Sequence, residues 1–335
     1  MEDQRTCLIV YNAFGSGQNA IADEFEATNN DRSEVEYIRT VIKDLGYNVR
    51  VMGIRRFTAP TVQKIQDINP DFIFNLCEAF NEESIGESYI AGFFELLKIP
   101  YTGSPPLALA LALNKKRTKQ ILKSAGIPVP YGVVVDLEEV PNLEELTPPY
   151  IVKPIREDGS AGITYKSVTS DNDEVIALVE KIHKEYEQAA IVEEYIEGRE
   201  LTIPIIGDKH PKILAIGEMD FSSIPKKEPK IITYQGKWDA HAPLDHKYPA
   251  QLDSALQKRI ERIAIKAFKE IGARDYARVD IRLAENRRPY VIEVNTNPLI
   301  SPEAGFAIAA EVSGMKYKDI IQEIIEETLK RKRRN

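Results

Sequence analysis

Apolar runs alternate with amphipathic segments along the first third of the chain. Apolar residues spaced three or four apart predict helices at 33–45, 58–67 and 83–97, and short apolar runs predict strands at 7–13, 48–54 and 71–76. Strands that alternate with helices in this way usually form a parallel sheet covered by helices. The N-terminal part is therefore expected to be an α/β layer structure.

Strand patterns dominate the rest of the chain. Further strands are expected at 132–135, 150–153, 162–167, 190–195, 201–206 and 213–219, and further helices at 114–125, 173–186, 251–271 and 318–330. Gly126 ends the helix at 114–125, and Pro128 and Pro130 force an extended exit. These patterns predict a module boundary near residue 113 and a small α+β unit behind it.

Two alternating runs around a polar loop near the C-terminus predict a β-hairpin. With the turn at 286–287, Asp280 lies opposite Glu293, and Arg278 lies opposite Asn295. Opposed residues of an antiparallel pair point to the same face, so these four polar side chains are expected together. The opposite, apolar face is expected to contain Val279, Ile281, Ile292 and Val294.

The facing carboxylates Asp280 and Glu293 would repel each other unless a cation lay between them. Together with the amide of Asn295 they form a set of hard oxygen ligands, which suits Mg²⁺ shared with substrate phosphates. The other interpretation is a solvated polar face in which Arg278 pairs with Asp280.

Three further segments could complement this face. Lys153 ends a predicted strand, and glycines at 159 and 162 in the loop behind it would let backbone N–H groups approach a phosphate. Glu193 and Glu194 lie where another strand ends, and could accept hydrogen bonds from an amine or a ribose hydroxyl. Each segment alone is more often an ordinary surface lysine, a plain hairpin turn or a solvated acidic edge.

Composition narrows the class of protein. The 335 residues carry a formal charge of −8 with a pI near 5.3, which argues against a nucleic-acid-binding surface. The basic residues 330–334 are expected to be a solvated tail behind a helix. Cys7 and Cys77 lie in apolar runs and are expected in cores. No apolar stretch is long enough to cross a membrane, and the N-terminus has no signal-peptide pattern, so a cytoplasmic protein is expected.

In order and spacing, several motifs resemble those of the D-alanine:D-alanine ligase branch of the ATP-grasp enzymes. They lie at 95–104, 110–119, 127–130, 152–154, 193–196, 234–238, 278–280 and 293–298. The resemblance implies an α/β, three-module ATP-grasp fold. It consists of an N-terminal parallel-sheet α/β module (1–113), a small central α+β lid module (114–199) and a C-terminal α+β module (200–335).

The resemblance also implies roles for individual residues, with ATP and Mg²⁺, or Mn²⁺ in its place, as cofactors. The metal ligands would be Asp280, Glu293 and Asn295. Arg278 would stabilise the oxyanion of a tetrahedral intermediate. The implied nucleotide contacts are Lys115 and Lys153 at the phosphates, Gly159 and Ser160 in the phosphate loop, Lys237 at the γ-phosphate, Glu193, Glu194 and Ile196 at the adenine, and Glu200 at the ribose.

The amino-acid subsites depart from the family pattern. Gly159, Trp238, Leu299 and Ala304 stand where the family has a serine, a tyrosine, a glycine and a serine. The glutamate that binds the first substrate could correspond to Glu34, Glu78 or Glu87. We therefore expect a carboxylate–amine ligase that acts through an acyl phosphate on small amino-acid or carboxylate substrates, with altered subsites and a homodimeric assembly common in the family.

Three alternatives stay open. The protein could be a genuine D-alanine:D-alanine ligase of cell-wall synthesis, or a nucleotide-binding module without catalysis. Gly15 to Ala20 also fits a loose dinucleotide fingerprint, but the second strand ends in Arg55 and Arg56 rather than the acidic residue that NAD binding needs.

Overall fold

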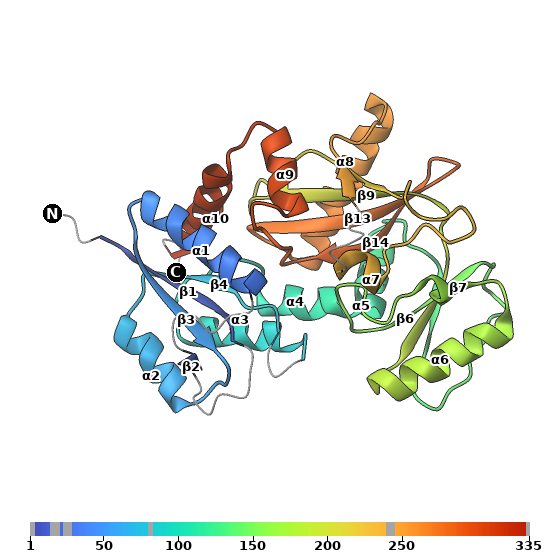
Figure 1. Cartoon of the computed structure of the whole chain (residues 1–335), viewed down its shortest axis with the longest axis horizontal. Helices are drawn as coiled ribbons and strands as arrows, with labels where there is room; N and C mark the ends of the chain where they lie inside the picture. Colours follow the sequence, from blue (N-terminus) through green and yellow to red (C-terminus); the bar gives the residue numbers. More distant parts are fainter. Residues whose placement is uncertain (1–3, 14–20, 23–28, 80–82, 239–244, 333–335) are drawn as a thin grey trace.

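The computed structural model describes residues 4–13, 21–22, 29–79, 83–238 and 245–332, whose strands form three sheets (Figure 1). The first sheet has the order β2-β3-β1-β4, in which β1 pairs in parallel with β3 and β4, as predicted. The antiparallel edge strand β2 was not expected. The strands are β1 (Thr6–Asn12), β2 (Ile21–Ala22), β3 (Asn48–Ile54) and β4 (Phe72–Leu76).

Both faces of the first sheet are covered by helices. Cys7 and Ile9 of β1 point into a core that includes residues of α1 (Asn29–Asp44) and α10 (Tyr317–Lys332). Leu8 and Val10 point into the opposite core, with α2 (Ala59–Ile68) and α3 (Gly86–Leu96). Successive residues of β1 are thus all buried, which is typical of a central parallel strand. Cys7 and Cys77 are fully buried free thiols, as expected.

The second sheet has the order β12-β11-β9-β13-β14, with β10 also paired to β9. Helix α8 (Ser254–Ile271) covers one of its faces, where Ile260 and Phe268 share a core with Val279 and Ile281. The opposite face of β13 and β14 is consequently left for polar side chains. The strands are β9 (Gly198–Ile206), β10 (Lys212–Ile213), β11 (Gly217–Asp220), β12 (Asp245–Lys247), β13 (Tyr276–Ala284) and β14 (Pro289–Asn295).

The third and smallest sheet has the order β5-β8-β6-β7 and is covered by α6 (Asn172–Tyr186), at the lower right of Figure 1. Its strands are β5 (Gly132–Val135), β6 (Tyr150–Pro154), β7 (Val168–Thr169) and β8 (Ala190–Glu194). The strand expected at 162–167 is wrong. Ser160 and Gly162 have positive φ angles of 64° and 74°, which turn the chain, and the 3₁₀ helix Tyr165–Ser167 follows.

Other elements also differ from the sequence prediction. The strand expected at 213–219 is divided between β10 and β11. Helices α4 (Pro106–Leu113), α7 (Tyr234–Trp238) and α9 (Gly305–Val312) were not expected. The Asn114 side chain accepts a hydrogen bond from the Arg117 backbone N–H, and this cap begins α5 (Lys115–Ser124) directly behind α4.

The expected solvated tail is wrong at Arg331. Helix α10 continues to Lys332, and the Arg331 guanidinium donates two hydrogen bonds to the fully buried Asp275 carboxylate. Arg331 also donates to the Tyr101 carbonyl at 2.8 Å, and thereby ties α10 to the N-terminal sheet. Within the described ranges, no helix is both long and apolar enough to span a membrane.

Candidate active site

The β13–β14 hairpin has the predicted polar face. Asp280 is paired with Glu293 and Arg278 with Asn295, as the sequence predicted. The Arg278 Nε and Nη2 atoms donate to the Asp280 carboxylate, each at 2.8 Å. A register shift follows Asp280, so that Ile281 pairs with Val291.

This shift makes the expected apolar face wrong at one position. Val291, and not Ile292, is fully buried beside Val279, Ile281 and Val294, whereas Ile292 is only half-buried.

Cations from two other parts of the chain influence this face. Burial alone would raise the pKa of Glu293, but Lys115, Arg278 and Lys237 together lower it. Lys237 lies on α7, and its own pKa is lowered by desolvation and by the positive charge of Arg278. Lys115 begins α5, and its Nζ donates to the Glu157 carbonyl. The structure thus brings these three cations to the two facing carboxylates.

Asp158 belongs to this charge cluster, although the sequence analysis did not single it out. Although Asp158 is exposed at the surface, partial desolvation by the surrounding protein raises its pKa to about 6, and the negative charge of Glu293 adds to the rise. Its position in the loop between Lys153 and Gly162 was the only signal for it in the sequence.

The predicted phosphate loop (residues 156–162, behind β6) has the backbone that its glycines suggested. Gly159, Ser160 and Gly162 all have positive φ angles. A side chain at Gly162 would place its Cβ 2.9 Å from the Pro154 side chain, so glycine is needed there for space as well as conformation. Ser160 is half-buried at the tip of this loop.

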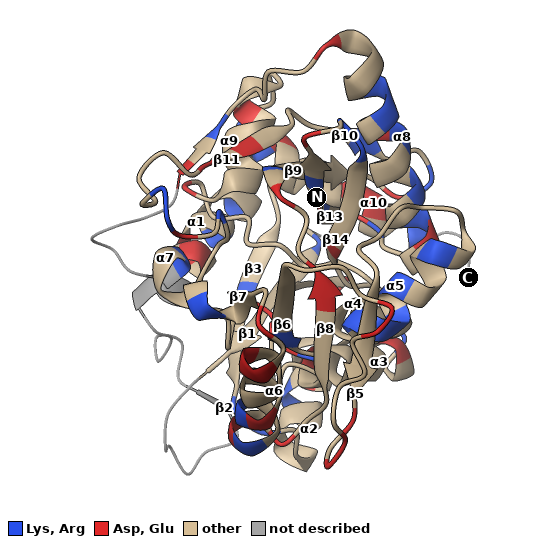
Figure 2. Ribbon diagram, turned by 90° about the vertical axis from the view of Figure 1, so that its right-hand side faces the viewer, with Lys and Arg blue, Asp and Glu red and all other residues tan. Residues whose placement is uncertain are grey.

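A buried carboxylate joins the small sheet to α5. Glu193 lies at the end of β8, is not accessible to solvent, and pairs with two lysines. Its Oε1 is 2.7 Å from the Lys119 Nζ, and its Oε2 is 2.6 Å from the Lys153 Nζ. Figure 2 shows this acidic end of β8 in red and the basic residues of α5 in blue. Lys119 was missed by the sequence analysis, although it lies on the same helix as Lys115 and is four residues away.

The remaining predicted nucleotide contacts extend from Glu193 toward β13. Glu200 is buried on β9, 3.6 Å from the Arg282 guanidinium, and burial raises its pKa. Ile196 is half-buried between β8 and β9. The Glu194 carboxylate accepts a hydrogen bond from the Thr147 backbone N–H at 3.0 Å, so it is engaged by the loop before β6.

The three candidate substrate glutamates have different surroundings. Glu34 is buried on α1 and accepts a hydrogen bond from the Ile300 backbone N–H at 3.2 Å, in the loop behind β14. Glu87 lies in the first turn of α3. Burial raises its pKa well above the usual value, although a hydrogen bond from Asn297 acts to lower it. Glu78 is exposed.

Of the positions expected to depart from the family pattern, Gly159 lies in the loop behind β6 and the others lie in different segments. Leu299 is 47% exposed, and Ala304 precedes α9. Trp238 ends α7. Gly15 to Ala20, the loose dinucleotide fingerprint, lie outside the described residues.

The ligand chemistry of the hairpin fits a magnesium ion that is shared with phosphates. Asp280 and Glu293 provide two carboxylates on one face, and Asn295 adds an amide oxygen. Among the residues that the structure describes, no group of three or more histidine, cysteine, aspartate and glutamate side chains could hold a metal alone. Phosphate oxygens and water would complete the coordination.

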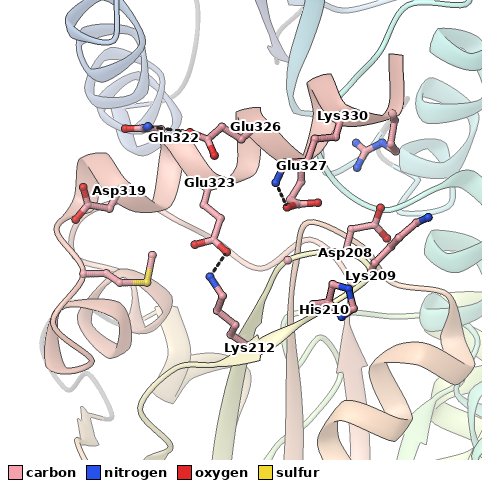
Figure 3. Close-up of a pocket in the computed structure, with 13 residues that line it drawn as sticks. Asp208, Lys209, His210, Lys212, Asp319, Gln322, Glu323, Glu326, Glu327 and Lys330 are labelled. Atoms are coloured by element: carbon pink, nitrogen blue, oxygen red, sulfur yellow. Dashed lines mark hydrogen bonds and ion pairs between the residues drawn. The ribbon is translucent and has the colours of Figure 1, made fainter. Parts of the chain in front are cut away.

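A separate hollow lies between α10 and the turn that joins β9 to β10 (Figure 3). It is lined by acidic residues of α10, and Glu323 pairs with Lys212 across it at 3.0 Å. The residues of the hairpin and the phosphate loop do not line it.

Comparisons with known proteins show the family of this chain. The family described as "D-ala D-ala ligase C-terminus" matches residues 121–326. A D-alanine–D-alanine ligase of Bartonella henselae is 32% identical over 290 residues, which cover 86% of this chain and 89% of that protein. The uncharacterized protein y4sG of Sinorhizobium fredii is 30% identical over 254 residues, which cover 76% of this chain and 73% of that protein.

A solved structure shows the same fold. The D-alanine–D-alanine ligase of Bacillus anthracis, complexed with ATP, aligns with a TM-score of 0.76 and 22% identity, and 99% of each chain is covered. Fold and family together define an ATP-grasp enzyme, a ligase that forms a carbon–nitrogen bond. The chain belongs to the D-alanine–D-alanine ligase family, as its motifs suggested.

Proposed function

We propose that this protein is an ATP- and Mg²⁺-dependent ligase that joins the carboxylate of one substrate to the amine of another, with a preference other than two D-alanines. The hairpin carries this proposal. Asp280 and Glu293 face each other there, and Lys115, Lys237 and Arg278 act on the same face. A triphosphate with its metal would balance such a cluster, since cations and metal together offset the charge that develops during phosphoryl transfer.

The proposed sequence of steps begins with phosphorylation. The substrate carboxylate attacks the γ-phosphorus of ATP, ADP leaves, and an acyl phosphate forms. Lys237 offsets charge on the transferred phosphoryl group. The amine then attacks the acyl carbon, Arg278 stabilises the oxyanion, and phosphate leaves. Bound Mg²⁺ would neutralise phosphate charge, with Asp280, Glu293 and Asn295 as its protein ligands.

Oxygen-18 in the carboxylate of the first substrate tests this order of events. Because the carboxylate oxygen attacks phosphorus, the label is expected in released phosphate. Label in AMP would instead indicate an adenylate and reject the acyl-phosphate route.

The altered subsites support a preference for a substrate pair other than two D-alanines. The hydroxyl groups that the family places at positions 159 and 304 are missing, and each charged substrate group left unpaired costs about 1–3 kcal/mol. A matrix of amino acids, scored by phosphate release with mass spectrometry of the products, tests this preference. A pair other than two D-alanines is expected to give the highest kcat/KM.

A genuine D-alanine–D-alanine ligase is the second candidate, because the relative from Bartonella henselae has that name. A kcat/KM for D-alanine alone of about 10⁴ M⁻¹s⁻¹ or more, unmatched by other pairs, would favour it. We also propose a cytoplasmic location, where ATP is supplied, and a homodimer, which light scattering of the purified chain would test.

A further inference from the structure

A buried lysine lies beside the proposed nucleotide site without a role in the proposed reaction. Lys119 on α5 has a side chain that is only 10% exposed. Its Nζ lies 2.7 Å from the Glu193 Oε1 and donates to the Ile292 carbonyl at 3.4 Å. The other Glu193 oxygen is 2.6 Å from Lys153. One buried carboxylate therefore binds two ammonium groups from different elements.

The charges of this trio do not cancel. Burial lowers the pKa of Lys119 to about 8, although the negative charge of Glu193 acts to raise it. Burial would raise the pKa of Glu193, but the two lysines outweigh it and hold the value at about 2. The cluster thus has two ammonium groups for one carboxylate, which leaves one positive charge in excess.

We propose that Lys119 is a positioning residue that neutralises Glu193, so that the charge of Lys153 stays available to the nucleotide phosphates. Without Lys119, Glu193 and Lys153 would form a neutral buried pair, and the phosphates would have to compete with the carboxylate for Lys153. With Lys119 present, Glu193 keeps a partner when Lys153 turns to the phosphates. This inference rests on the proposed ATP site.

Calorimetric titration of the intact chain with Mg-ATP tests the first consequence. Lys119→Met is expected to raise the Kd for Mg-ATP by about tenfold or more, because a buried carboxylate then competes for Lys153. Lys119→Arg keeps the charge and should recover most of the affinity. Lys123→Met removes an exposed lysine from the last turn of the same helix and should leave the Kd within about twofold of wild type.

A double-mutant cycle separates charge balance from a structural role. In the Glu193→Gln background there is no carboxylate to neutralise, so adding Lys119→Met should change the Kd by less than about twofold. A purely structural lysine, or one that binds phosphate itself, would cost the same factor in both backgrounds, and that result would overturn the inference. So would an unchanged Kd for Lys119→Met.

The variants also distinguish a folding defect from a failure of the proposed function. If Lys119→Met does not fold, Glu193→Gln can be compared with the double variant, because without the Glu193 carboxylate the loss of Lys119 leaves no buried charge unpaired. Equal affinities of these two variants for Mg-ATP support the inference, and a tenfold gap overturns it. Wild-type protein that does not bind Mg-ATP would reject the proposed function itself. If the wild-type protein binds Mg-ATP, but the effects of Lys119→Met and Glu193→Gln on the Kd are additive, only the proposed role of Lys119 is rejected.

Discussion

Asp275 lies where the N-terminal sheet, the hairpin and α10 meet. Its carboxylate is inaccessible to solvent and accepts hydrogen bonds from the Gly103 backbone N–H at 2.8 Å and from Thr328 at 3.3 Å. Arg331 adds two more, one of them at 2.8 Å. Asp275→Asn would preserve the shape of the side chain and tolerate the φ of 65° at this position, but it removes the charge and turns an NH₂ group toward a donor, because both carboxylate oxygens accept hydrogen bonds.

The cost of this change follows from the contacts. Breaking a buried ion pair by removing one partner costs about 3–5 kcal/mol, and the lower end applies because the Arg331 side chain is 20% exposed. An unfolding entropy of about 2.1 cal/mol/K per residue gives about 0.7 kcal/mol/K for a chain of this length. A loss of about 3 kcal/mol should therefore lower the Tm by about 4 °C.

Differential scanning calorimetry measures this shift directly. Arg331→Met should also destabilise the protein, and the double variant should lose less than the sum of the single changes, because neither charge is then left alone. Turnover at room temperature should change little, since Asp275 lies outside the charge cluster of the hairpin. A Tm for Asp275→Asn within about 1 °C of wild type would refute the argument that this carboxylate holds the parts together.

Three further changes test the site. Glu293→Gln should raise the Mg²⁺ concentration needed for half-maximal turnover by about tenfold or more, because it removes a proposed metal ligand, and it should also lower the Tm, because Lys115, Arg278 and Lys237 stabilise the charge that is lost. Gly162→Ala should destabilise by about 1–3 kcal/mol in urea unfolding, more than Gly46→Ala, which shares the positive φ but has open space. Asp158 has a raised pKa, so its contribution to stability is present at low pH and lost as the pH rises through about 6. The unfolding free energy of wild type relative to Asp158→Asn should accordingly fall between pH 4 and 7, and a pH-independent difference would contradict the shift.

Periodicity predicted the elements that bury a regular face. The parallel sheet, α8 and the pairing of Asp280 with Glu293 were all foreseen, because each has long alternating or helical spacing. Helix α4 was not, because its leucines and alanines are apolar at every position and show no helical period. The 3₁₀ helix at Tyr165–Ser167 was mistaken for a strand, because the turn depends on backbone angles that the apolar pattern does not encode.

Side-chain contacts between distant elements were beyond the sequence. Lys119 and Asp158 belong to charge clusters only because α5, β8 and the phosphate loop approach the hairpin. The basic C-terminus is typical of a solvated tail, yet Arg331 reaches a carboxylate that lies 56 residues earlier in the chain. In each case the partner is fixed by packing, and local composition gives no indication of it.

The one error in the predicted hairpin lies next to its polar face. A constant register from the turn assigns Ile292 to the buried face, and Val291 is just as apolar, so the sequence could not distinguish them. The shift behind Asp280 leaves Ile292 without a directly paired residue on β13, as in a β-bulge. The Ile292 carbonyl accepts from Lys119 at 3.4 Å, so the irregularity gives α5 a contact on the strand that carries Glu293. The Ile292 carbonyl thus connects the lysine beside Glu193 with the strand of the proposed metal ligands.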